Sequence, residues 1–235
     1  MIINPFIIKV GAETLTGTIL DNGNFCAPPR FVFLHGGGDY SIKERIYDFA
    51  EPILKKKINI LTFDFSGHGE STGEIKESSL KKRVIEAKEV INQFVIESPI
   101  ILSGASMGGY IALKILKSYN VKTVILFGPA LYDAKAYDVR FDQGFTQIIR
   151  EPESWRNTDV LETLENFEGN LLIVIGEKDE VIPPGVIQLI YTHAKKARKK
   201  EIYTIPNCPH KINTWIADYP SELVKLHNKI TEYIE

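Results

Sequence analysis

Short runs of consecutive apolar residues recur along the chain, and longer amphipathic stretches separate them. The apolar runs cover residues 31–34, 58–63, 100–102, 121–127 and 171–175, with a weaker one over 202–205. Runs of this kind are typical of strands that are buried on both faces. The stretches between them predict helices over 40–57, 78–97, 107–118, 184–197 and 221–234. The alternation predicts an α/β fold, with a mostly parallel central sheet and helices on both of its faces.

Two further segments complete the predicted layout. Residues 6–10 and 14–20 predict two short strands joined through Gly11, which would add an antiparallel edge to the sheet. Between 129 and 169 no buried-strand pattern appears, although helical fragments do, over 144–150 and 159–167. Roughly 40 residues are too many for a plain connection in a compact domain. We therefore expect one domain over 1–235 with a small helical cap inserted at about 130–168.

Composition and charge exclude several classes of protein. The 235 residues are 44% hydrophobic and 25% charged, as in soluble globular proteins, which argues against disorder and collagen-like repetition. The net charge of −2 gives no footprint for nucleic acid. It also suits an uncharged or apolar substrate better than a polyanion. The basic run 195–200 lies at a predicted helix end, where cations complement the dipole.

Membrane insertion and secretion are not expected either. No apolar run approaches the ~20 residues of a membrane span, and the first ten residues lack a charged leader. Cys26 and Cys208 fit no metal-ligand spacing and are expected to be reduced thiols of a cytoplasmic protein. The pattern makes no prediction of oligomeric state.

The strongest chemical signal is the sequence GASMGG over 104–109, directly after one predicted strand and before a predicted helix. A serine nucleophile must project its hydroxyl from a sharp strand-to-helix turn, and Gly104 and Gly108 leave room for that turn because they lack Cβ atoms. The following helix start directs unpaired amides towards developing negative charge. Ser106 is therefore the predicted nucleophile. The alternative is an ordinary Gly/Ser turn.

A second glycine-rich segment, HGGG over 35–38, follows the strand 31–34. Consecutive glycines let backbone amides approach a substrate oxygen closely. We expect the amides of Gly37 and Met107 to form an oxyanion hole. His35 is interpreted as a structural hydrogen-bonding residue, and a flexible loop is the alternative reading of the segment.

An acid and a base remain to be found, and chain order suggests both. Asp179 follows the strand 171–175, and it could orient a histidine, although Glu177 and Glu180 are neighbouring alternatives. His210 follows the last predicted strand and is the one histidine after the acid at a strand end. The order Ser106, Asp179, His210 is a known solution of the serine triad.

Together these segments resemble the α/β-hydrolase family over nearly the whole chain. The likeness is carried by HGGG at 35–38, DFSGHGES at 64–71, GASMG at 104–108, the acid loop 176–183 and His210. The resemblance implies a Ser–His–Asp triad and a cap after the sixth strand. A serine at position 106, where some family members carry aspartate, argues against dehalogenases and epoxide hydrolases. Small carboxylesterases, cinnamoyl esterases and monoacylglycerol lipases look nearest.

The predicted activity is hydrolysis of a small-molecule carboxylic ester without metal or organic cofactor. Within the class, a thioesterase or a peptidase is the alternative, because the same triad cleaves those acyl bonds. From another class, a small-molecule receptor with very slow turnover is the alternative. Aromatic residues of the cap could line an acyl or aryl pocket, or could instead attach the cap to the sheet. They are Tyr132, Tyr137, Phe141, Phe145 and Trp155.

Overall fold

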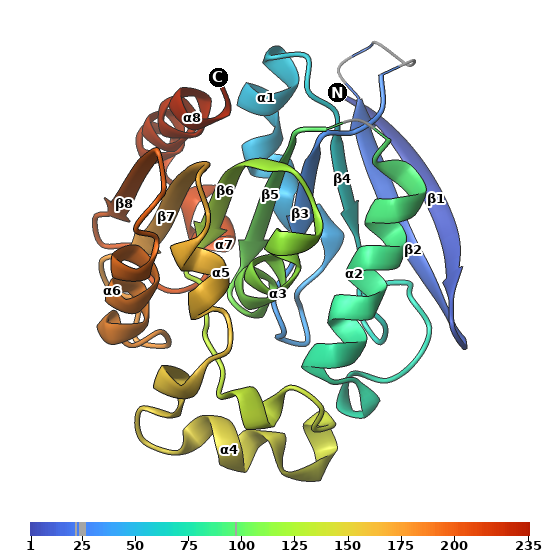
Figure 1. Cartoon of the computed structure of the whole chain (residues 1–235). Helices are drawn as coiled ribbons and strands as arrows, with labels where there is room; N and C mark the ends of the chain where they lie inside the picture. Colours follow the sequence, from blue (N-terminus) through green and yellow to red (C-terminus); the bar gives the residue numbers. More distant parts are fainter. Residues whose placement is uncertain (22, 24–26, 97) are drawn as a thin grey trace.

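An eight-stranded sheet forms the centre of the molecule (Figure 1). The computed structural model describes residues 1–21, 23, 27–96 and 98–235. In chain order the strands are β1 (Ile2–Val10), β2 (Glu13–Asp21), β3 (Phe31–Leu34), β4 (Ile60–Phe63), β5 (Ile100–Ala105), β6 (Val121–Phe127), β7 (Asn170–Gly176) and β8 (Lys199–Ile205). Their order across the sheet is β1-β2-β4-β3-β5-β6-β7-β8. β2 is antiparallel to both of its neighbours, β1 and β4, and the other neighbouring pairs are parallel.

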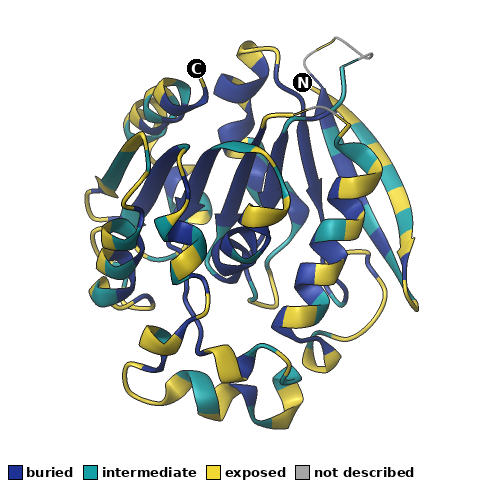
Figure 2. Cartoon of the chain, viewed as in Figure 1, coloured by how far each residue is buried: buried dark blue, intermediate teal, exposed yellow. Residues whose placement is uncertain are grey.

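Consecutive residues of the central strands serve opposite faces of this sheet, which explains their unbroken apolar runs. In β3, Val32 and Leu34 pack into one hydrophobic cluster, whereas Phe31 and Phe33 pack into the other. All four side chains are at most 1% exposed. Figure 2 shows the central strands in the buried class along most of their length. The predicted parallel sheet, covered on both faces, is confirmed.

Helices cover both faces. They are α1 (Tyr47–Lys55), α2 (Leu80–Phe94), α3 (Met107–Ile115), α6 (Pro184–His193), α7 (Ile212–Ile216) and α8 (Pro220–Ile234), with short turns η1 (Lys43–Ile46), η2 (Ile75–Glu77) and η3 (Leu116–Ser118). The clusters place α2, α3 and α6 on one face and α1, α7 and α8 on the other. None of the described helices is long and apolar enough to cross a membrane.

Helix ends are where the sequence-based prediction and the structure differ most. α2 begins after Ser79, whose hydroxyl accepts a hydrogen bond from the Lys82 amide at 3.1 Å and caps the helix. α6 ends at His193, so the basic run is not a helix terminus as predicted. Its last two residues, Lys199 and Lys200, instead begin β8, because that segment pairs with β7. α7 was not predicted from the pattern.

The segment between β6 and β7 extends beyond the carboxyl ends of the parallel strands (Figure 1). It contains η4 (Ala134–Ala136), η5 (Phe141–Phe145), α4 (Thr146–Arg150), η6 (Ser154–Asn157) and α5 (Leu161–Glu165). Its apolar side chains, among them Tyr132, Phe145 and Leu164, belong to the same hydrophobic cluster as α2 and α3. The segment is thus attached to one face of the sheet by buried contacts. We refer to residues 129–169 as the β6–β7 segment.

Candidate active site

Ser106 lies at the tight turn between β5 and α3. Its backbone has φ 51° and ψ −116°, a conformation that is strained for a residue with a side chain. A Cβ atom on Gly108 would lie 2.1 Å from the Leu34 carbonyl oxygen, and one on Gly104 would lie 2.2 Å from the Gly108 oxygen. The turn therefore requires glycine at both positions, as the sequence analysis expected on steric grounds.

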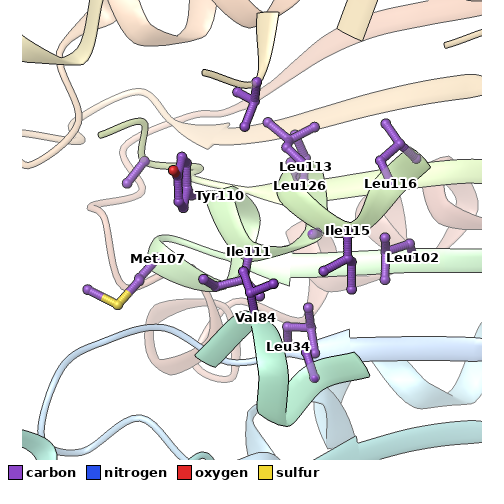
Figure 3. Close-up of a cluster of buried hydrophobic side chains, with 14 of the residues drawn as sticks. Leu34, Val84, Leu102, Met107, Tyr110, Ile111, Leu113, Ile115, Leu116 and Leu126 are labelled. Carbon is purple, nitrogen blue, oxygen red and sulfur yellow. The ribbon is translucent and has the colours of Figure 1, made fainter. Parts of the chain in front are cut away.

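α3 holds this turn rigidly because it is buried. Of its nine residues, Met107 to Ile115, only Lys114 is not in the buried class. Figure 3 shows Ile111 and Ile115 gathered with Leu34 of β3 and Val84 of α2. Packing on several sides gives the strained serine a firm support.

Asp179, His210 and Ser106 form a continuous series of hydrogen bonds. His210 donates from Nδ1 to Asp179 Oδ2 at 2.8 Å, and its Nε2 lies 3.3 Å from Ser106 Oγ. The His210 and Asp179 side chains are 18% and 7% exposed. The three residues come from loops after β5, β7 and β8, whose carboxyl ends meet at one edge of the sheet. The structure therefore brings together the three residues predicted as the triad.

Three hydrogen bonds keep the Asp179 carboxylate ionised. Burial alone would raise its pKa, but His210 and the amides of Ile182 and Val181 donate to it and together hold the pKa below its ordinary value. The alternative acid Glu177 instead accepts a hydrogen bond from the Asn207 amide at 2.8 Å. Glu180 is exposed. Of the three carboxylates considered from the sequence, Asp179 is the one bonded to His210.

Two backbone amides close to the serine turn have no hydrogen-bond partner among the described residues. Gly37 and the side chain of Met107 are in contact, since a Cβ on Gly37 would lie 2.7 Å from Met107 Cε. Neither the Gly37 amide nor the Met107 amide donates a hydrogen bond within the described ranges. Met107 is also the first residue of α3, where the backbone amides have no partner inside the helix. Both predicted oxyanion donors are therefore free to bind a ligand oxygen.

A buried polar network supports the loop that carries Gly37. Arg83 of α2 is fully buried; it donates to His68 Nε2 at 2.7 Å and to the Gly36 carbonyl at 3.5 Å. His68 in turn donates from Nδ1 to the Ser41 carbonyl at 2.9 Å. Burial lowers the pKa of Arg83 to about 10, so it remains a cation at neutral pH. The network connects α2 to both ends of the 36–41 loop.

His35 has the structural role that the sequence analysis expected. The Phe65 amide donates to its Nε2 at 3.0 Å, and its Nδ1 donates to the Gly36 carbonyl at 2.7 Å. Arg83 is the participant that sequence reasoning missed. A charged residue among the apolar positions of the amphipathic helix 78–97 was the available signal, since such a cation must find partners.

A cavity of about 610 Å³ lies beside Ser106. It is lined by Phe33, His35–Ser41, Arg45, Ala105, Ser106, Phe127 and His210–Thr214. None of the five aromatic residues predicted to contact substrate lies in this lining. Tyr132 instead packs on Tyr110 of α3 with ring centroids 5.2 Å apart, and Trp155 packs against Gly185 of α6. These two contacts attach the β6–β7 segment to α3 and α6, which is the alternative role considered for the aromatic residues.

Cys208 is a buried free thiol whose pKa burial raises to about 12, and Cys26 lies outside the described residues. Within the described ranges, no group of three or more His, Cys, Asp or Glu side chains could hold a metal ion.

Comparison with known proteins identifies the family. The sequence model of the family described as serine aminopeptidase, S33, matches residues 28–152. The chain belongs to this family of α/β-hydrolases. The matched range includes β3, the serine turn, α3 and the first part of the β6–β7 segment.

Sequence relatives of this α/β-hydrolase include protein bem46 of Schizosaccharomyces pombe. It is 27% identical over 158 residues, which cover 65% of this chain and 52% of the relative. A Mycoplasma pneumoniae protein named as an esterase/lipase is 32% identical over 147 residues, 58% of this chain and 52% of the relative. The chain thus spans about half the length of the curated relatives it matches.

Solved structures show the same fold over nearly the whole chain. Est1E from Butyrivibrio proteoclasticus, determined with ferulic acid bound, superposes with a TM-score of 0.75 at 19% identity, covering 97% of both chains. The thioesterase domain from the curacin biosynthetic pathway superposes with a TM-score of 0.68 at 16% identity, covering 97% of this chain and 99% of the other. At these identities the likeness establishes the α/β-hydrolase fold alone, and the activity has to be inferred from the geometry of the site.

Proposed function

We propose that the protein is a serine hydrolase that cleaves carboxylic esters through an acyl-enzyme intermediate. The observation that carries this proposal is the hydrogen-bonded series Asp179–His210–Ser106 beside two amides that have no partner in the described part of the chain. A nucleophile, a base, an orienting acid and an anion site are the four parts that acyl transfer requires. Relatives named as esterases support the choice of an ester.

In the first half of the reaction, Ser106 Oγ attacks the ester carbonyl carbon and its proton passes to His210 Nε2. The carbonyl electron pair moves onto oxygen, where the amides of Gly37 and Met107 stabilise the negative charge. Asp179 keeps Nδ1 of His210 protonated and stabilises the imidazolium that forms. The tetrahedral intermediate then breaks its bond to the alcohol oxygen, which leaves with the proton from Nε2.

In the second half, water replaces the alcohol. His210 Nε2 takes a proton from the water as its oxygen attacks the acyl carbon, and the same two amides bind the oxyanion again. Collapse of this intermediate returns the proton to Ser106 Oγ and releases the carboxylic acid. No group beyond the chain and water enters this scheme.

Substitution of the nucleophile tests the proposal. Ser106→Ala should lower the rate of 4-nitrophenyl butyrate hydrolysis by roughly 10³-fold or more while the circular dichroism spectrum is unchanged. A fluorophosphonate probe should label the wild-type protein at Ser106 and leave the variant unlabelled. Wild-type rates in Ser106→Ala would contradict the assignment.

The acid offers a matched pair of variants. Asp179→Asn should reduce kcat severely, by roughly 10³- to 10⁴-fold, because an amide no longer fixes the His210 tautomer or stabilises its positive charge. Glu177→Gln, two residues away on the same loop, should retain activity within a few-fold. If Glu177→Gln were the more impaired variant, the acid would be misassigned.

The family description favours one second candidate, hydrolysis of an aminoacyl or peptide amide. A parallel panel of 4-nitrophenyl esters, thioesters and aminoacyl 4-nitroanilides separates these activities by kcat/KM. A receptor function would instead give Ser106 labelling with a burst of acylation and turnover slower than once per hour on every substrate. Multiple turnovers per minute on any ester would exclude that reading.

A further inference from the structure

The cavity beside Ser106 is lined by both apolar and cationic side chains. Phe33, Phe127 and Ile212 form apolar lining, whereas Arg45 and Lys211 supply two positive charges. Within the described residues neither cation has a carboxylate within ion-pair distance. Such unpaired cations in a concave site are available to an anionic ligand.

Arg45 is held in place before any ligand binds. Its guanidinium donates to the Tyr40 carbonyl at 2.9 Å and to Thr214 Oγ1 at 3.3 Å, and Asn213 donates to its backbone carbonyl. These contacts connect the 36–41 loop with α7. They occupy two of the guanidinium hydrogen-bond donors and leave the others unpartnered within the described part of the chain.

The turn that carries Arg45 is itself anchored in the interior. Lys43, two residues earlier in η1, forms a buried ion pair with Asp64 at 2.7 Å, and its amide donates to the other carboxylate oxygen at 2.7 Å. Thr62 Oγ1 also donates to the Lys43 carbonyl. Arg45 therefore presents its charge from a fixed backbone, which reduces the entropy lost when it binds a ligand.

The charge balance of the lining favours a monoanion. Asp39 is the acid among the lining residues, so Arg45, Lys211 and Asp39 together leave a net charge of +1. His35 adds no charge, because burial, with the neighbouring His68 and Arg83, lowers its pKa well below the ordinary value. A planar guanidinium with free donors matches a carboxylate, whereas a doubly charged phosphate would exceed the net charge available.

We propose that the enzyme prefers esters that carry a carboxylate on one limb, with Arg45 binding that carboxylate and Lys211 adding to its attraction. This inference rests on the proposed ester hydrolysis. The reacting carbonyl lies at Ser106, the chain of the substrate contacts the apolar lining, and the carboxylate meets Arg45. Half-esters of dicarboxylic acids and esters of hydroxybenzoates are the substrate class that fits.

The test compares each acid with a neutral isostere. Monomethyl adipate and methyl adipamate place the charge on the acyl limb, whereas 4-acetoxybenzoate and 4-acetoxybenzamide place it on the alcohol limb. At least one pair should show a kcat/KM ratio of roughly tenfold or more in favour of the anion, as a charged hydrogen bond predicts. The ratio should fall when NaCl is raised from 50 to 500 mM.

Variants assign the preference to Arg45. Arg45→Gln should lower the anion-to-neutral ratio towards one, whereas Arg45→Lys should retain a ratio several-fold above one, because the charge remains. Lys211→Gln should lower the ratio partially. Lys9→Gln, which removes an exposed cation from β1 away from the cavity, should keep the wild-type ratio.

Binding to inactive protein separates this inference from the hydrolysis itself. Calorimetry on Ser106→Ala should give a tighter Kd for the preferred anionic ester than for its amide, and Arg45→Gln should remove the difference. Ester hydrolysis with equal rates within both pairs would overturn the carboxylate preference and leave the proposed function intact. Absence of ester hydrolysis would contradict the proposed function, and equal Kd values would then overturn the carboxylate site independently.

Discussion

His35 and His68 are buried histidines that hydrogen-bond to the 36–41 loop, and burial lowers the pKa of both. Burial, followed by the adjacent Arg83 charge, lowers the pKa of His68 to about 4. In the unfolded chain a histidine has an ordinary pKa near 6.5. Between these two values the unfolded state binds a proton that the folded state does not bind, so the free energy of unfolding must fall as the pH falls. The full stabilisation is present at pH values above the histidine pKa of the unfolded chain.

This predicts acid sensitivity that can be assigned to one side chain. Urea unfolding between pH 7 and pH 4.5 should show a loss of stability of up to about 1.4 kcal/mol per pH unit for each such histidine. His68→Gln, which can still accept from Arg83 and donate to Ser41, should lose less stability over this range. His193→Gln, at a half-buried histidine near the end of α6, is the control. Equal slopes for wild type and His68→Gln would count against the buried neutral histidine.

The site residues predicted from the sequence follow strands, whereas those that were missed lie on a helix and a short turn. Ser106, Asp179 and His210 were predictable because each follows a strand, and the carboxyl ends of parallel strands meet at one edge. Arg83 and Arg45 come from a helix and a short turn, and their importance depends on contacts that exist only after folding. A single sequence shows their charge and gives no sign of the partners.

α3 packs closely against β3 because Gly108 has no Cβ atom. A Cβ on Gly108 would lie 2.1 Å from the Leu34 carbonyl oxygen and 2.5 Å from the His35 oxygen, and neither backbone group can move without shifting the sheet. Gly108→Ala should therefore destabilise the protein by about 3 kcal/mol or more, the upper range for overpacking. Gly38→Ala is a matched control, because its Cβ would meet Ser41 Oγ at 3.6 Å, an ordinary contact.

Chemical denaturation of the two variants gives the comparison. Gly38→Ala should unfold within about 0.5 kcal/mol of wild type. Accumulation of Gly108→Ala in inclusion bodies, with Gly38→Ala soluble, agrees with the expected order. A soluble Gly108→Ala with wild-type stability would show that the serine turn tolerates a Cβ and that the close contact is not needed.

Strands were easier to predict than helix ends because helix ends depend on contacts that form only after folding. β3 and β6 have the predicted bounds because unbroken apolar runs are required wherever both sheet faces are covered. Helix ends depend on caps and on competition with strand pairing, as the basic run before and within β8 shows. α7 has five residues, too few for a periodic pattern to become visible.

In the whole molecule, the residues that attach the β6–β7 segment are different from those that line the cavity beside Ser106. Phe145 is 5% exposed and belongs to the hydrophobic cluster that also contains α2 and α3, and its ring centroid lies 4.6 Å from that of Phe141. Tyr40 is 81% exposed and lines the cavity. Truncation of Phe145 and truncation of Tyr40 to alanine should therefore have opposite effects on stability and on KM.

Phe145→Ala should lower the free energy of unfolding by about 3–5 kcal/mol, the cost of truncating a buried aromatic residue, with KM for 4-nitrophenyl butyrate within twofold of wild type. Tyr40→Ala should change stability by less than about 0.5 kcal/mol and alter KM several-fold, because it removes part of the cavity wall. Urea denaturation and initial-rate kinetics on the same preparations measure both quantities. The reverse pattern, a changed KM with unchanged stability in Phe145→Ala, would place substrate on the β6–β7 segment. Selectivity would then be determined by that segment instead of by the wall formed by the 36–41 loop, Arg45 and α7.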